Sequence, residues 1–162
     1  MRKVVVNTTP LIALSHVGQL EVLKDLYGEI IIPDAVYREL AVKEESISKK
    51  AVDNALDWIH IEHIQNHMAK SMYKTQLHDG EVEVMILSKE IEADIVIIDD
   101  GNAKKHAKYL GLPVTGTLGI LIKAKQEGYI TELKPILYQM VKNGIYISNS
   151  LVDLCLKQVG ED

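Results

Sequence analysis

A run of aliphatic residues ends on two adjacent carboxylates, Asp99 and Asp100. Residues 95–98 are all Ile or Val, which is typical of a strand buried on both faces of a parallel sheet. Open α/β sheets bind their ligands at the edge where such strands end. Two like charges there repel each other unless a cation or a proton intervenes, so the pair indicates a binding site. The alternative is that one aspartate caps the helix that follows.

Other oxygen-bearing side chains follow predicted strands or open predicted helices, namely Asn7, Glu39, Glu81 and Glu83. We expect some of them to meet the aspartate pair, because the carboxyl ends of parallel strands share one edge of a sheet. Oxygen ligands without accompanying cysteines suit Mg²⁺ or Mn²⁺ better than Zn²⁺. These ions activate water and stabilise the transition state of phosphoryl transfer.

Each glutamate also has a purely structural explanation. Glu39 is spaced to pair with Lys43 on an exposed helix face. Glu81 and Glu83 lie in the first turn of a predicted helix, where carboxylates stabilise the helix dipole. The sequence leaves open which of these two faces a metal, and it leaves the same question open for Asp99 and Asp100.

Strands that alternate with helices position these residues. The predicted strands are 4–7, 29–32, 58–63, 93–98 and 113–115. The first predicted helix begins near Pro10, and the others cover 34–40, 43–57, 81–90, 102–110, 120–126, 133–142 and 149–159. Residues 65–76 show only a weak pattern. This alternation predicts an α/β fold, a three-layer α/β/α arrangement with a central, mainly parallel sheet. Without a linker or repeat, we expect a single domain over 1–162.

Composition excludes several classes of protein. The net charge of −5 argues against binding nucleic acid through a global positive field, although it allows local basic patches. Candidates for phosphate contacts are Lys104 and Lys105, just after the acidic pair, and Lys123 and Lys125. The alternative is that these lysines lie on a solvated helix face.

No apolar run approaches the ~20 residues of a membrane span. The single cysteine, Cys155, agrees with a cytoplasmic location.

Five segments, in this order along the chain, resemble the PIN-domain family of Mg²⁺-dependent ribonucleases, and in particular a prokaryotic PIN-like nucleic acid-binding branch. They are Val5–Ile12, Ile32–Leu40, Asp79–Glu83, Ile97–Asp100 and Val114–Gly119. The resemblance covers nearly the whole chain and implies a compact parallel α/β fold with a cluster of carboxylates.

The resemblance also implies roles for individual residues. It places the metal ligands at Asn7, Glu39, Glu81, Asp99 and Asp100, and the four acids among them form the catalytic set. Thr8, Lys104, Lys105 and Thr117 are the expected RNA contacts. Asn7 departs from the family pattern, which usually has aspartate there. Because an amide oxygen carries no negative charge, we expect weaker metal binding.

We therefore expect a cytoplasmic endoribonuclease that uses Mg²⁺ or Mn²⁺. The resemblance is compatible with a role as the toxin of a toxin–antitoxin pair. RNA, an antitoxin protein and a second copy of the chain are the implied partners. The alternative is a weakened or inactive PIN-like module that binds RNA or protein, because Asn7 replaces the first acid. A phosphotransfer receiver domain is disfavoured, since its carboxylate pair would follow the first strand.

Overall fold

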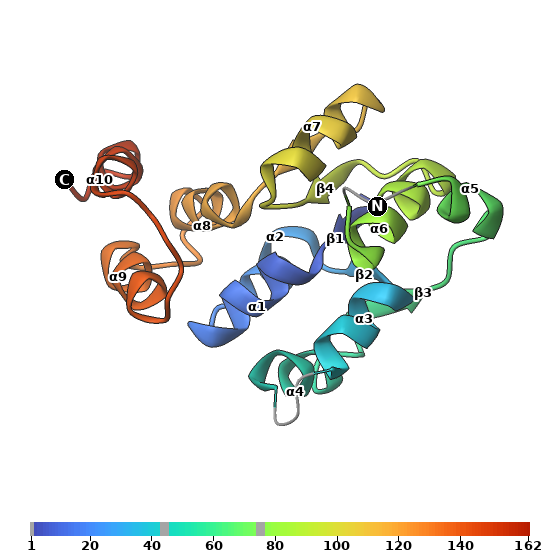
Figure 1. Ribbon diagram of the computed structural model, residues 1–162. Coiled ribbons are helices and arrows are strands. Elements are labelled where there is room, and N and C mark those ends of the chain that lie inside the picture. Colours follow the sequence, from blue (N-terminus) through green and yellow to red (C-terminus); the bar gives the residue numbers. More distant parts are fainter. Residues whose placement is uncertain (1, 43–45, 74–76) are drawn as a thin grey trace.

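A five-stranded parallel sheet forms the centre of the computed structural model, which describes residues 2–42, 46–73 and 77–162 (Figure 1). The strands are β1 (Val4–Val6), β2 (Ile30–Pro33), β3 (Ile59–Glu62), β4 (Ile95–Ile97) and β5 (Val114–Thr115). Their order is β3-β2-β1-β4-β5. Val6 pairs with Ile97, and Ile97 in turn pairs with Thr115. The ends of β1, β4 and β5 therefore lie side by side.

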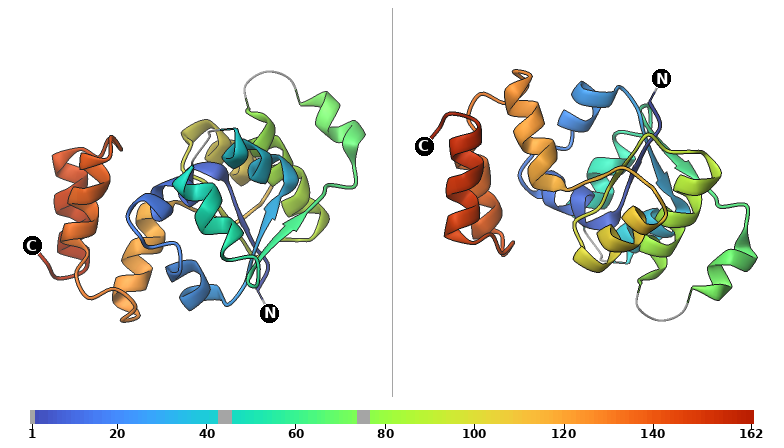
Figure 2. Two further views of the ribbon diagram at one scale, coloured as in Figure 1. Left: turned by 90° about the horizontal axis from the view of Figure 1, so that it is seen from below. Right: turned by 90° about the horizontal axis from the view of Figure 1, so that it is seen from above.

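Helices cover both faces of the sheet. They are α1 (Thr8–His16), α2 (Val22–Tyr27), α3 (Asp34–Ala41), α4 (Ile47–Asp53), α5 (His67–Met72), α6 (Asp79–Glu90), α7 (Gly101–Tyr109), α8 (Thr117–Gln126), α9 (Lys134–Lys142) and α10 (Asn149–Gln158). Parallel connections are right-handed, so the helices between β1 and β3 lie on one face, and α6 and α7 lie on the other. The two opposed views in Figure 2 show these two layers. The predicted three-layer α/β/α fold is confirmed.

Aliphatic side chains from the sheet and from both layers form the core. Val4, Val5 and Val6 are fully buried, which explains why β1 occupies the middle of the sheet. Farther from the sheet, α8, α9 and α10 form a helical extension that carries the C-terminus (Figure 1). In the described residues, no helix is both long and apolar enough to cross a membrane.

Several helix boundaries differ from the prediction. The first helix begins at Thr8, two residues before Pro10. Proline is tolerated there because the N–H groups of the first turn have no partner within the helix. The predicted helix over 43–57 is observed as α4, which starts after the Ser46 cap, and Lys43 lies outside the described residues. Thr117, rather than Ile120, begins α8.

The sequence did not predict α5. None of its residues is buried, so it lacks the apolar periodicity that marks a packed helix. Its start does carry a local signal, because the Asn66 side chain accepts a hydrogen bond from the Ala69 N–H at 2.9 Å.

Candidate functional site

A pocket of about 410 Å³ opens where β1 and β2 lead into their helices. Its lining comes from the start of α1, from α3 and from the start of α6. We call it the acidic pocket, and its lining residues are Asn7, Thr8, Thr9, Glu39, His78, Asp79 and Glu81. Three of the predicted metal ligands therefore come together.

Asn7 follows β1 directly, and its backbone N–H donates to the Ile97 carbonyl at 3.0 Å. The residue is 3% exposed. Although it precedes α1, its side chain makes no capping hydrogen bond. Its Oδ1 atom has no hydrogen-bond partner among the described residues. Leaving a buried polar atom unpaired costs about 1–3 kcal/mol, so this oxygen is suited to receive a ligand.

Glu39 connects three helices at the pocket. One carboxylate oxygen accepts a hydrogen bond from the Thr8 hydroxyl at 2.6 Å, and the other accepts one from the Gly80 N–H at 2.6 Å. A Cβ atom at Gly80 would lie 2.6 Å from the nearer oxygen, so any other residue there would displace the Glu39 carboxylate from this position. Glu39 thus points into the pocket, whereas the alternative, a pair with Lys43, involves a residue outside the described part.

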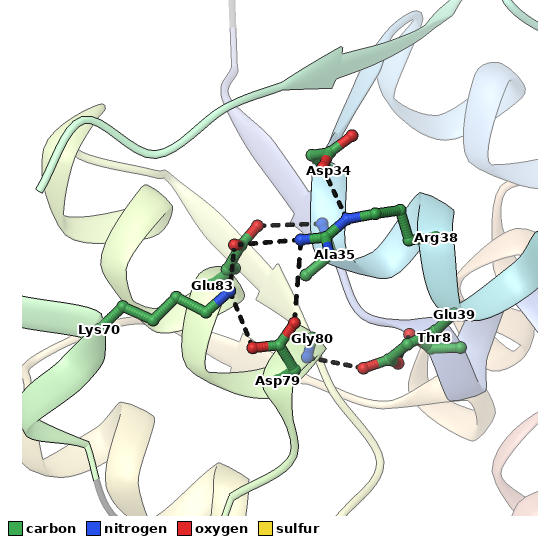
Figure 3. A network of polar contacts seen from close by, with 9 residues as sticks. All are labelled: Thr8, Asp34, Ala35, Arg38, Glu39, Lys70, Asp79, Gly80 and Glu83. Carbon is green, nitrogen blue, oxygen red and sulfur yellow. Dashed lines mark hydrogen bonds and ion pairs between the residues drawn. The ribbon is translucent and has the colours of Figure 1, made fainter. Parts of the chain in front are cut away.

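The two glutamates of α6 have different surroundings. Glu81 is 7% exposed, lines the acidic pocket and accepts a hydrogen bond from the His78 N–H at 2.9 Å. Glu83 is 4% exposed and accepts hydrogen bonds from the Ala35 N–H at 2.9 Å and the Lys70 ammonium at 2.7 Å (Figure 3). Glu81 therefore faces the pocket, while Glu83 fastens α3 and α5 to α6.

Asp99 and Asp100 lie at the end of β4, outside the lining of the acidic pocket. Thr117 holds Asp99 through its N–H at 2.8 Å and its hydroxyl at 2.5 Å. A Cβ atom at Gly116 would lie 2.8 Å from Asp99 Oδ1 and 2.9 Å from Lys104 Nζ. Asp100 is exposed and caps α7, accepting a backbone N–H at 2.9 Å. Capping, the structural alternative, therefore applies to Asp100.

The predicted acids thus fall into two sets, one around the acidic pocket and one at the end of β4. In the described ranges, no three His, Cys, Asp or Glu side chains are grouped to hold a metal ion. The pocket nevertheless offers the Asn7 amide oxygen beside the carboxylates of Glu39 and Glu81. A carboxylate oxygen that accepts one hydrogen bond keeps a lone pair for a second partner. This all-oxygen donor set fits Mg²⁺ or Mn²⁺.

The basic candidates also separate. Lys104 is half-buried beside Gly116, and Lys105 is exposed on α7. Lys123 instead lies over the Tyr27 ring, 5.2 Å from its centre, and Lys125 lies 3.4 Å from the Glu161 carboxylate. Lys104 and Lys105 are thus better placed than Lys123 and Lys125 to meet a ligand at the end of β4.

Neither His78 nor Asp79 was among the predicted site residues, although both line the acidic pocket. The available signal was their place directly before Gly80 and Glu81, at the start of a helix. Lys70, whose helix went unpredicted, was not among the predicted site residues either.

The comparisons with known proteins agree with this architecture. The DUF3368 family model, described as a PIN domain, matches residues 3–161. The comparison with curated proteins finds no match. The family match spans nearly the whole chain and confirms the resemblance seen in the sequence. The chain belongs to the PIN-domain family.

Proposed function

We propose that this protein is an endoribonuclease that depends on Mg²⁺ or Mn²⁺ and acts as a single domain over 1–162. The PIN-domain match supports a nuclease-type fold that binds nucleic acid. The buried Asn7 oxygen carries the proposal, because it has no hydrogen-bond partner in the described part of the chain and lies in one pocket with the carboxylates of Glu39 and Glu81. In a cation site without its metal, we expect a ligand oxygen to lack a hydrogen-bond partner, because the cation would be that partner.

In this proposal, Asn7, Glu39 and Glu81 hold the cation. Once bound, the cation supplies Lewis-acid activation of a water molecule and of the scissile phosphate. Thr8 and Gly80 fix the direction of the Glu39 carboxylate, which reduces the reorganisation needed on binding.

The second acidic set and the basic residues complete the proposed site. Thr117 orients Asp99 at the end of β4, and the exposed Asp100 that follows it adds a further carboxylate there. Lys104 and Lys105 orient the RNA backbone through phosphate contacts, which do not depend on sequence. Thr8 and Thr117 contribute by holding carboxylates and by bordering the bound RNA.

A second candidate function is an inactive module that binds RNA or protein. Two observations favour it: Asn7 brings no charge to the first acidic position, and the two sets of carboxylates are not grouped within the described residues. In such a module, the hydrogen bonds to Glu39 and Asp99 would only stabilise the fold.

Cleavage of a labelled RNA with Mn²⁺ or with EDTA tests the proposal. We expect cleavage only with Mn²⁺, more by Asn7→Asp, which restores the missing charge, and none by Glu81→Gln or Asp100→Ala. Asp153→Asn, at an exposed position on α10, is the matched control and should cleave like wild type. Circular dichroism confirms folding, since Asp100 also caps α7. Equal cleavage by all variants would indicate a contaminating nuclease.

We further propose a cytoplasmic protein that forms a homodimer and pairs with an antitoxin. Light scattering tests the dimer. A neighbouring gene for a small DNA-binding protein that suppresses growth arrest on co-expression would support the toxin role, and harmless overexpression of the chain alone would contradict it.

A further inference from the structure

A second pocket, of about 400 Å³, lies between α5 and α6 and shares Asp79 with the acidic pocket. We call it the α5–α6 pocket. Its lining residues are His67, Lys70, Ser71, Tyr73, Leu77, Asp79 and Val82. A polymer bound at the acidic pocket would therefore have a cavity for a neighbouring unit.

The polar edge of this pocket is a fixed ion pair. Lys70 Nζ lies 2.8 Å from Asp79 Oδ1 and 2.7 Å from Glu83 Oε2 (Figure 3). Burial opposes its charge, but the hydrogen bonds from Lys70 to Asp79 and Glu83 raise the pKa of the ammonium. Asp79 is 52% exposed at its side chain and also has the Arg38 guanidinium 3.8 Å away. The edge thus places a charged donor beside a carboxylate with accessible acceptor sites.

The apolar side of this pocket is formed mainly by the aromatic ring of Tyr73. The Tyr73 ring packs edge-on against His106, with ring centres 5.2 Å apart and planes at 71°, and its hydroxyl lies 3.2 Å from His106 Nε2. This contact fixes the ring, and Leu77 and Val82 add apolar surface beside it. A fixed aromatic ring in a partly apolar pocket is a stacking surface for an unpaired base.

The charges around the pocket favour a base over a phosphate. Lys70 and Arg38 are both matched by carboxylates, from Asp79, Glu83 and Asp34. From the described residues, a phosphate would meet no net positive charge there. A neutral base can stack on Tyr73 and form hydrogen bonds with the Lys70 ammonium and the Asp79 carboxylate at the polar edge of the pocket.

We propose that the α5–α6 pocket binds the base of the nucleotide next to the scissile phosphate and prefers guanine, an inference that rests on the proposed RNA substrate. Guanine presents two adjacent N–H donors and a carbonyl oxygen on its pairing edge. The Asp79 carboxylate can accept from both donors while Lys70 donates to the carbonyl. The other three RNA bases lack that pair of donors. Such two-point contacts discriminate between bases by about tenfold or more.

Sequencing of the ends cut from a random RNA pool tests this specificity. We expect guanine to be enriched about tenfold or more at one fixed position beside the cut. Asp79→Asn should remove that enrichment, and Tyr73→Leu should weaken it. Tyr146→Leu is the matched control, because Tyr146 is 90% exposed and far along the chain. Replacing the guanosine with inosine, which lacks one donor, should slow cutting by the wild type but not by Asp79→Asn. Cuts without base preference would overturn the inference.

Binding without metal separates this inference from the nuclease proposal. In NMR titrations with the four nucleoside monophosphates, we expect guanosine monophosphate to shift the amide signals of Lys70, Tyr73 and Asp79 most. Those shifts, in a protein that cleaves no RNA, would sustain the base pocket and reject the nuclease. Equal shifts with all four nucleotides, or none, would reject the base pocket even if RNA is cleaved.

Discussion

Replacing Asn7 with aspartate adds a charge to a side chain that is 3% exposed and whose oxygen is unpaired within the described residues. Burying an unpaired carboxylate costs several kcal/mol, and the wild-type amide already bears about 1–3 kcal/mol. We therefore expect metal-free Asn7→Asp to be less stable than wild type by about 2–3 kcal/mol. In a domain of this size, that loss lowers the melting temperature by about 4–12 °C.

Adding Mn²⁺ should reverse the loss, because the new carboxylate would then be a ligand. A metal at one hundred times its dissociation constant stabilises the folded state by about 2.7 kcal/mol. Melting curves in EDTA and in Mn²⁺, followed by circular dichroism, measure both effects.

Asn7→Leu is the matched control for this prediction. It removes the oxygen that has no partner among the described residues and keeps the branching of the side chain, so the metal-free protein should gain about 1–3 kcal/mol in stability. It should also show no response to Mn²⁺. If Asn7→Asp melts like wild type in EDTA and stays unchanged in Mn²⁺, the Asn7 oxygen is not part of a cation site.

Three further predictions concern other parts of the molecule. Gly80→Ala should destabilise the protein and lower its activity, because the added Cβ would lie 2.6 Å from the Glu39 carboxylate and displace it. Gly101→Ala, where a Cβ would meet no described atom within 4 Å, should be neutral or stabilising, and urea unfolding compares the two variants. Hydrogen bonds from the start of α9, acting against burial, hold the pKa of Glu161 below its usual value. The charged form of Glu161 therefore stabilises the fold above about pH 4.3. We expect Glu161→Gln to lower the free energy of unfolding by about 1 kcal/mol at pH 7, and this difference should disappear as the pH falls through the folded-state pKa. An unchanged difference at low pH would contradict this prediction. Lys105→Ala should weaken RNA binding equally for all RNA sequences, and it should reduce the slope of the logarithm of the binding constant against the logarithm of the salt concentration by about 0.7–1. Fluorescence anisotropy measures this slope, and an unchanged slope would show that Lys105 does not contact the RNA.

The fold was predictable wherever burial leaves a pattern in the sequence. The valines of β1 and the Ile/Val run before Asp99 gave two neighbouring strands, and the structure pairs Val6 with Ile97. Helix α5 was not predictable in this way, because it buries no residue and so lacks an apolar face.

The candidate site was predictable only in part, because strand ends indicate where side chains start and not where they point. Asn7, Glu39 and Glu81 do line one pocket. The choice between Glu81 and Glu83 depends on partners from α3 and α5, distant in sequence from both glutamates. Likewise, the contact between Asp99 and Thr117 joins residues from two strand ends, and no local pattern reports it.

Calorimetric titration of the protein with Mn²⁺ tests most directly whether the acidic pocket holds a divalent cation. We predict saturable uptake by the wild type, and an affinity lower by about tenfold or more for Glu39→Gln, which keeps the size of the side chain but removes its charge. No uptake by the wild type, or the same affinity in both proteins, would contradict the assignment of this pocket as a metal site.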